Sequence, residues 1–213
     1  MTAMEAAVRA PAPPPEAVPA RRLDHDNIVV FDGFTWGDFQ RLLSIRGDRP
    51  GPRLAYLEGL VEIMTPSRSH ESIKSVLGCL LEAWCLERGV EFSPYGSWTL
   101  EDKEVERALE PDECYVFGED EEPKRPDLAI EVVWTSGGID KLEIYRKLDV
   151  REVWWWEAGR LTLYALRGER YEEIAASEVL PDVDLPELLR FLDVKPTSRA
   201  IREYRRALQS GEG

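Results

Sequence analysis

Residues 126–134 read PDLAIEVVW, and this stretch decides the fold. Its apolar side chains fall on both faces of an extended chain, which is typical of a strand covered on both sides. Two amphipathic helices flank it in sequence. The first begins at Ser67 or Ser69 and ends at Gly89, and the second spans residues 139–148. The stretch therefore predicts the central strand of an α/β sheet with helices packed against it.

Shorter elements surround these three. Each is bounded by a capping residue or by a turn pair such as Glu58-Gly59 or Ala158-Gly159. The order predicts an α/β fold in which a mixed central sheet is flanked by helices, with an extra helix and hairpin at the N-terminus and helices at the C-terminus. The remaining predicted elements are a helix from Thr35 to Ile45, strands at 54–57, 60–64, 93–100, 112–117, 152–157 and 161–166, and helices at 186–192 and 198–208.

Composition places the chain among ordinary globular proteins. Its 213 residues are 43% hydrophobic, which suits one domain with a substantial core. We expect a disordered Pro/Ala-rich tail at 1–22, a domain at 23–195, and a C-terminal helix and tail at 196–213. No apolar run is long enough to span a membrane, and the first residues do not resemble a secretory signal. A cytoplasmic protein is therefore expected.

The charge of the chain is strongly negative and unevenly distributed. A net charge of −14 argues against a protein that coats nucleic acid, because phosphate binding usually draws on a basic surface. Eleven carboxylates and only two basic residues lie within 101–122, a segment we interpret as a solvated loop. The rest of the chain is much closer to neutral, so its charge is compatible with a local basic groove.

Three charged residues are difficult to explain as ordinary surface positions. Glu131 lies amid apolar neighbours and needs a cation or hydrogen bonds to offset its desolvation, unless it is a solvated edge residue. Lys141 projects from the apolar stripe of its helix and can supply that cation or extend to solvent. Asp112, otherwise a turn residue, can join Glu131 from a neighbouring strand. Two such carboxylates can bind Mg²⁺, which polarises a phosphoryl oxygen and activates water.

Three upstream residues are further candidates. His70 falls on the core side of its helix, where it is either a metal ligand or a core or capping histidine. Glu71 projects away from the apolar stripe and is the poorer inward ligand. Glu62 shares a strand face with Leu60 and Met64 and is a weaker third candidate.

Several short motifs occur in a particular order and spacing along the chain. They are YLEGLVEIMTPSRSHE at 56–71, Pro111-Asp112, PDLAIEV at 126–132, Asp140-Lys141 with Tyr145, and Glu152-Val153-Trp154. Together these motifs resemble the Uma-two family of the PD-(D/E)XK nuclease superfamily. The resemblance covers about residues 25–192 and implies a restriction-endonuclease-like αβββαβ core. It also implies an endonuclease that hydrolyses DNA with Mg²⁺ or Mn²⁺.

The resemblance also implies roles for individual residues. Asp112 and Glu131 match the two carboxylates, Lys141 the catalytic lysine, and His70 a histidine at the head of the first helix. Asp112, Glu131 and His70 are then the metal ligands. Two departures stand out: Val133 occupies the position of the superfamily's strand lysine, and Asp149 replaces a family glycine. Asp127 competes with Asp112, because it also follows a proline and shares the face of Glu131.

A second class of function fits the same sequence. A non-catalytic module could use a nuclease-like fold for protein interaction, with the acidic 101–122 segment as its contact surface. We also expect a homodimer, because the Trp-rich hairpin at 152–166 and the terminal helices leave more aromatic surface than one small sheet needs.

Overall fold

The structure is a computed structural model that describes residues 25–47, 49, 51–96, 98–120 and 122–211. The tail predicted at 1–22 lies outside the described residues. Within them, no helix is long and apolar enough to cross a membrane.

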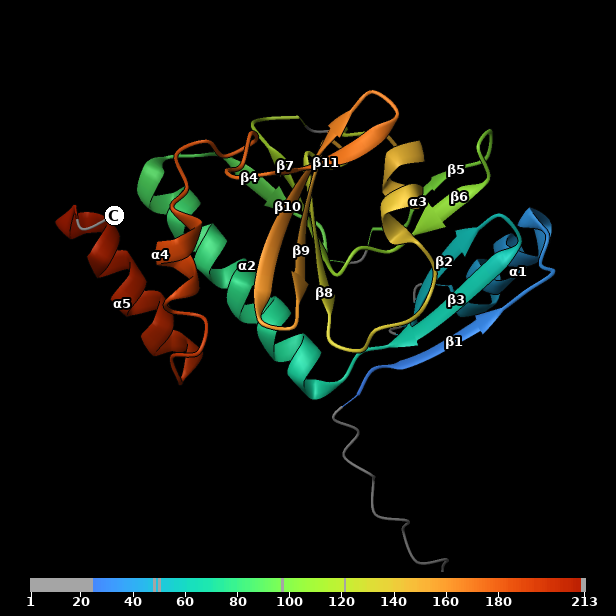
Figure 1. The fold of residues 1–213 in the computed structure, drawn as a ribbon, viewed down its shortest axis with the longest axis horizontal. Coiled ribbons are helices and arrows are strands. Elements are labelled where there is room, and N and C mark those ends of the chain that lie inside the picture. The colour runs from blue at the N-terminus through green and yellow to red at the C-terminus, as the bar shows by residue number, and fades with distance from the viewer. Residues whose placement is uncertain (1–24, 48, 50, 97, 121, 212–213) are drawn as a thin grey trace, which may run out of the picture.

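A six-stranded mixed sheet forms the centre of the molecule (Figure 1). β8 and β9 are parallel and every other neighbouring pair is antiparallel. β8 is the strand predicted from the apolar stretch, and all of its residues except Val133 are buried. The strands, in the order of the sheet, are β11 (Arg170–Ile174), β10 (Arg160–Arg167), β9 (Glu152–Glu157), β8 (Leu128–Val133), β7 (Glu113–Phe117) and β4 (Phe92–Pro94).

A second, antiparallel sheet of five strands lies beside the first. The helix α1 (Trp36–Arg46) packs against it and begins as predicted at Thr35, whose side chain forms a capping box with Asp38. The strands, in order, are β1 (Asn27–Phe31), β3 (Leu60–Thr65), β2 (Arg53–Leu57), β6 (Arg107–Leu109) and β5 (Leu100–Asp102).

Helices cover the two faces of the six-stranded sheet differently (Figure 1). On one face lies α2 (Arg68–Arg88), with α4 (Leu185–Leu189) and α5 (Thr197–Ser210) packed outside it. On the other face lie α3 (Lys141–Lys147) and the five-stranded sheet. The expected αβββαβ core is therefore present. It is formed, in chain order, by α2, β4, β7, β8, α3 and β9, and the predicted fold class is confirmed.

The ends of both core helices follow from local chemistry. The Ser67 side chain caps α2 by accepting a hydrogen bond from the His70 backbone nitrogen at 3.2 Å, and Gly89 ends the helix in the left-handed region at φ +66°. After α3, Asp149 adopts φ +57°, the conformation that glycine favours. The turn therefore forms despite the departure from the family pattern.

The structure corrects the expected organisation of residues 93–122. The strand predicted at 93–100 is divided, because the chain leaves the six-stranded sheet after β4 and enters the other sheet as β5. The acidic segment is not simply a solvated loop, since it contains the β5–β6 hairpin and the buried Glu110. The Glu110 carboxylate is compensated by Arg46 at 2.5 Å and by the Leu54 backbone nitrogen at 3.0 Å. Sequence periodicity also missed the short edge strands β1 and β11.

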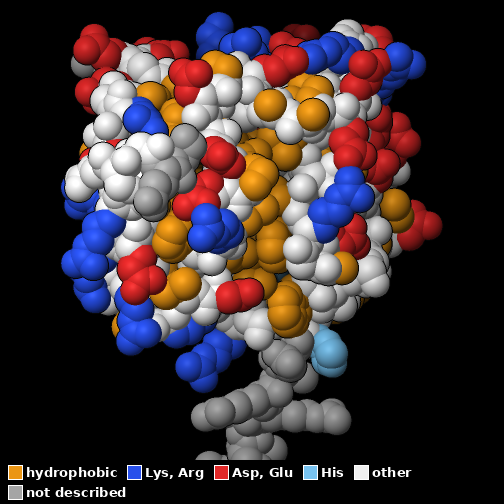
Figure 2. All heavy atoms as spheres, turned by 60° about the vertical axis from the view of Figure 1, so that its left-hand side comes forward, with side chains coloured by type: hydrophobic (Ala, Val, Ile, Leu, Met, Phe, Trp, Pro, Cys, Tyr) orange, Lys and Arg blue, Asp and Glu red, His pale blue; other side chains and the backbone are white. Residues whose placement is uncertain are grey.

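The Trp-rich hairpin is mostly internal. Trp154 and Trp156 pack into the core beneath α2, and only Trp155 faces the α3 side in partial contact with solvent. The hairpin therefore does not supply the surplus aromatic surface on which the homodimer was predicted, and the homodimer stays a prediction. Figure 2, which brings the α4–α5 side forward, shows a strip of hydrophobic side chains bordered by acidic and basic groups.

Candidate active site

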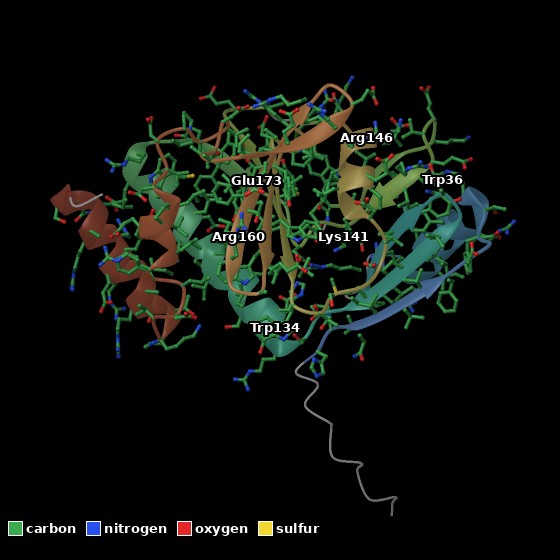
Figure 3. All side chains as sticks on the ribbon, viewed as in Figure 1. Trp36, Trp134, Lys141, Arg146, Arg160 and Glu173 are labelled. Atoms are coloured by element: carbon green, nitrogen blue, oxygen red, sulfur yellow. The ribbon has the colours of Figure 1, made fainter. Side chains whose placement is uncertain are left out.

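Asp112, Glu131 and Lys141 meet on the α3 face of the central sheet, beneath the five-stranded sheet, and His70 reaches Asp112 from the start of α2. Asp112 directly precedes β7, one residue beyond the Glu113–Ile130 pair that joins β7 to β8. Glu131 lies on β8, Lys141 begins α3, and His70 lies in the first turn of α2. Figure 3 shows Lys141 in the space between the two sheets.

Glu131 is wholly buried and is held by two side chains of α3. The Lys141 Nζ donates to Glu131 Oε2 at 2.6 Å, and the Tyr145 hydroxyl donates to Oε1. Burial, reinforced by the adjacent Glu131 carboxylate, raises the pKa of Tyr145 well above its ordinary value. Tyr145 therefore remains a protonated donor to Glu131 throughout the physiological pH range.

Asp112 is also wholly buried and links three elements. Its Oδ2 accepts a hydrogen bond from the Val132 backbone nitrogen at 2.7 Å, which fixes the carboxylate beside Glu131. Its Oδ1 is in ion-pair contact with the Arg53 guanidinium and lies 3.0 Å from His70 Nε2. Among the described residues, neither Oδ1 nor Nε2 has a partner in hydrogen-bonding geometry.

His70 is oriented from its other side by Asp26. The His70 Nδ1 lies 3.0 Å from Asp26 Oδ2, and Asp26 Oδ1 accepts a hydrogen bond from the Ser67 backbone nitrogen at 2.7 Å. Burial, the largest influence, lowers the pKa of His70 despite the opposing effect of Asp26. A neutral ring that donates from Nδ1 to Asp26 presents the lone pair of Nε2 to Asp112 Oδ1. Two adjacent acceptors with no hydrogen between them fit a bound cation.

The donor set suits a hard divalent ion with several water ligands. In the described part of the chain, no group of three or more His, Cys, Asp or Glu side chains is arranged to hold a metal. Mg²⁺ commonly uses only one or two carboxylates and completes its shell with water and phosphate oxygens. Asp112 and His70 meet this requirement, while Glu131 is engaged by Lys141 and Tyr145.

The structure places the three alternative carboxylates in other roles. Glu71 is partly exposed and pairs with Lys74 at 3.1 Å. Glu62 is buried among the residues around Lys141, where its Oε2 accepts from the Ile139 backbone nitrogen at 3.0 Å. Burial raises the pKa of Glu62 against the opposing effect of Lys141. Asp127 binds the Phe117 backbone nitrogen at the far end of β7 from Asp112.

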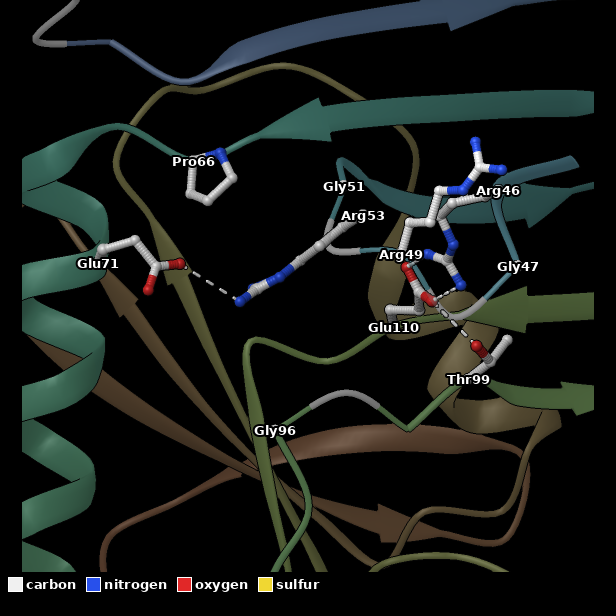
Figure 4. A pocket seen from close by; sticks show the side chains of 10 residues that line it. All are labelled: Arg46, Gly47, Arg49, Gly51, Arg53, Pro66, Glu71, Gly96, Thr99 and Glu110. Carbon is white, nitrogen blue, oxygen red and sulfur yellow. Dashed lines mark hydrogen bonds and ion pairs between the residues drawn. The ribbon is translucent and has the colours of Figure 1, made fainter. Parts of the chain in front are cut away.

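Two cavities flank the buried site. One, of about 140 Å³, is lined by Lys141, Glu62 and Asp26. The other, of about 480 Å³, is lined by Arg53 and Glu71 together with Arg46, Arg49 and Glu110 (Figure 4). Lys141 and Arg53 thus connect the buried carboxylates to the solvent on two sides.

Sequence reasoning missed three members of this site, Asp26, Arg53 and Tyr145. Tyr145 had a usable signal, because it lies four residues after Lys141 and so shares its helix face. Asp26 and Arg53 had none, since each belongs to a segment that the tertiary fold brings in from the five-stranded sheet.

Replacement of Tyr145 by Phe is expected to lower the free energy of unfolding by about 1–3 kcal/mol, because buried Glu131 loses a hydrogen-bond donor. Urea denaturation measures the change. The matched control is Tyr204→Phe, whose buried hydroxyl has no hydrogen-bond partner in the described residues, so its removal should be neutral or stabilising. Equal losses in the two variants would contradict the role given to the Tyr145 hydroxyl.

A protein-family model matches most of the chain. Residues 36–195 match the Uma2 family, which is described as "Putative restriction endonuclease". The match contains Arg53, His70, Asp112, Glu131, Lys141 and Tyr145, and it ends before α5. A search of curated proteins found no match.

Proposed function

This chain belongs to the Uma2 family, and from that premise we propose that it is an Mg²⁺- or Mn²⁺-dependent endonuclease that hydrolyses phosphodiester bonds in DNA. The family and the restriction-endonuclease-like fold indicate a nuclease.

One observation carries the proposal. His70 Nε2 and Asp112 Oδ1 are both buried and lie 3.0 Å apart, and Nε2 has no hydrogen-bond partner among the described residues. Asp112 Oδ1 is in ion-pair contact with Arg53, so Nε2 is the acceptor whose burial without a partner costs on the order of 1–3 kcal/mol, which a cation bound between the two atoms would recover. Asp112 lies next to Glu131, and Glu131 in turn accepts a hydrogen bond from the ammonium group of Lys141.

Each residue has a distinct proposed task. Asp112 and His70 would hold the ion, and Glu131, the third predicted ligand, would join them only by exchanging its bond to Lys141 or Tyr145. A bound Mg²⁺ or Mn²⁺ supplies a Lewis acid for the phosphoryl oxygen and lowers the pKa of a water. Glu131 also orients Lys141, whose ammonium group lines the smaller cavity and can neutralise charge that develops on a phosphate there. Asp26 fixes the ring of His70 as an outer-shell hydrogen-bond partner.

A second candidate function is the non-catalytic interaction module. The observation in its favour is the complete burial of Asp112 and Glu131, each of which already has a cationic partner. In this alternative, the charged network stabilises the contact between the two sheets, and the acidic 101–122 segment binds a partner protein.

Metal binding distinguishes the two candidates. At a concentration of about 100 times Kd, Mn²⁺ should raise the melting temperature of the wild-type protein by roughly 5–10 °C. Asp112→Asn should abolish this shift together with metal-dependent nicking of a plasmid. Asp127→Asn is the matched control, because Asp127 lies at the opposite end of β7 and should leave both responses intact. A wild-type protein with neither a shift nor nicking would favour the interaction module.

A further inference from the structure

Arg53 connects the larger cleft to the buried carboxylate of Asp112. It begins β2, lines the cleft, and extends toward Glu71 at the start of α2 (Figure 4). Its side chain is only 15% exposed and is in ion-pair contact with Asp112 Oδ1, the oxygen that faces His70. One guanidinium therefore lies both against the proposed metal ligand and at the edge of the cleft.

We propose that Arg53 is an exchangeable counter-ion. It neutralises Asp112 while the metal is absent, and it turns into the cleft to bind a phosphate group of the substrate strand when a metal ion takes its place. The inference rests on the proposed metal site and adds to it a residue that couples metal binding to phosphate binding.

The contacts of Arg53 suit a group that can be displaced. Its Nη2 nitrogen lies 3.4 Å from both Glu71 Oε1 and the Asp112 backbone oxygen, which are long distances for charge-assisted hydrogen bonds. Its Nη1 nitrogen is buried against Asp112 Oδ1, so the Asp112 carboxylate is the principal partner of the guanidinium. A cation held by Asp112 and His70 would compete for the same oxygen.

Arg46 provides an instructive contrast in the same cleft. Its guanidinium bonds both carboxylate oxygens of Glu110 at 2.5 Å, and Glu110 also accepts from Thr99 and from the Leu54 backbone. Arg46 is therefore fixed in a buried network. Arg53 differs because, among the described contacts of the cleft, its principal partner is Asp112, the carboxylate that a metal ion would bind.

The cleft offers Arg53 an anion site when it turns. Arg46 and Arg49 line the same space of about 480 Å³, and Gly51 and Gly96 contribute no side-chain bulk. A guanidinium binds a phosphate through two parallel N–H donors, a geometry that a phosphodiester satisfies. Because Arg46 is already paired with Glu110, Arg49 and Arg53 are the arginines of this cleft that a phosphate would engage.

The first test is the affinity for Mn²⁺, measured by calorimetry with the full chain. Arg53→Met should bind Mn²⁺ about tenfold more tightly than wild type, because removal of a unit charge in contact with Asp112 removes the competitor. Arg49→Met removes the same charge from the same cleft without touching Asp112 and should change the affinity much less. Arg53→Lys, which keeps the charge, should stay near wild type. An Arg53→Met affinity equal to or weaker than wild type would overturn the proposal.

The second test is the coupling between metal and anion, with sulfate as a non-hydrolysable analogue of phosphate. Wild type should bind sulfate more tightly in MnCl₂ than without metal, and Arg53→Met should lose this difference. Sulfate binding that is independent of Mn²⁺ in wild type would also overturn the proposal.

Two further outcomes are decisive. If Arg53→Met does not fold alone, Mn²⁺ should restore its melting transition by replacing the lost charge, and a failure of this rescue would count against the counter-ion role. If wild type and Asp112→Asn are equally unresponsive to Mn²⁺, the proposed metal site itself fails. A responsive wild type with an unchanged Arg53→Met rejects only the exchange of Arg53.

Discussion

Replacement of Lys141 by Met is expected to slow metal-dependent plasmid nicking by about 10²–10³-fold, which corresponds to about 3–4 kcal/mol of transition-state stabilisation. The ammonium group lies 2.6 Å from Glu131 Oε2 and lines the smaller of the two cavities that flank the site. Its removal takes away a charge that acts chiefly on the transition state. Methionine retains most of the apolar stem, so the packing of α3 is largely preserved.

The same substitution should also reduce stability by about 3 kcal/mol, because buried Glu131 loses its cationic partner. Rates are therefore compared at a temperature at which circular dichroism shows the variant to be folded. Lys141→Met combined with Glu131→Gln should recover part of the stability and none of the nicking rate. Lys147→Met, a matched change at the other end of α3, should leave the rate near wild type. A folded Lys141→Met that nicks at the wild-type rate would exclude the catalytic role.

Replacement of Gly138 by Ala is expected to destabilise the protein by about 3 kcal/mol or more. Gly138 has φ +103°, and an added Cβ would overlap the Glu62 carboxylate, whose Oε2 binds the Ile139 backbone nitrogen. Either the carboxylate or the loop that leads into α3 must shift. Because α3 carries Lys141 and Tyr145, the shift should also reduce nicking. Denaturant unfolding and the nicking assay measure the two effects.

The neighbouring Gly137 supplies the control for Gly138. It has φ +115°, but an added Cβ would meet nothing within 4 Å, so Gly137→Ala carries only the backbone strain, about 1–2 kcal/mol. The difference between the two alanine variants isolates the steric conflict with Glu62. The double variant with Glu62→Ala and Gly138→Ala should lose less free energy of unfolding than the sum of the losses in the two single variants, because the two side chains would be in direct contact. Strict additivity would contradict this account.

Local sequence patterns were sufficient to predict the positions of the core helices and strands. The apolar stretch at β8, the caps Thr35 and Ser67, and the stop at Gly89 all lie where the sequence predicted them. The same patterns failed for 93–122, where one expected strand is shared between two sheets. They failed because acidic side chains predict solvent exposure, whereas Glu110 is buried by an arginine 64 residues away.

Some residues of the candidate site were likewise predictable from local patterns, and others were not. Glu131, Lys141 and Tyr145 lie within 14 residues of one another, so strand and helix periodicity determine from the sequence alone that they can meet. Asp112 was predicted to join them from a neighbouring strand, and the β7–β8 register brings it beside Glu131. Asp26 lies 44 residues from its partner His70, and Arg53 lies 59 residues from its partner Asp112. Only the tertiary structure places each of them against its partner. Periodicity reports which face a side chain occupies within one element. The partner of a buried charge is decided by how separate elements pack, because that packing determines which charges leave water together.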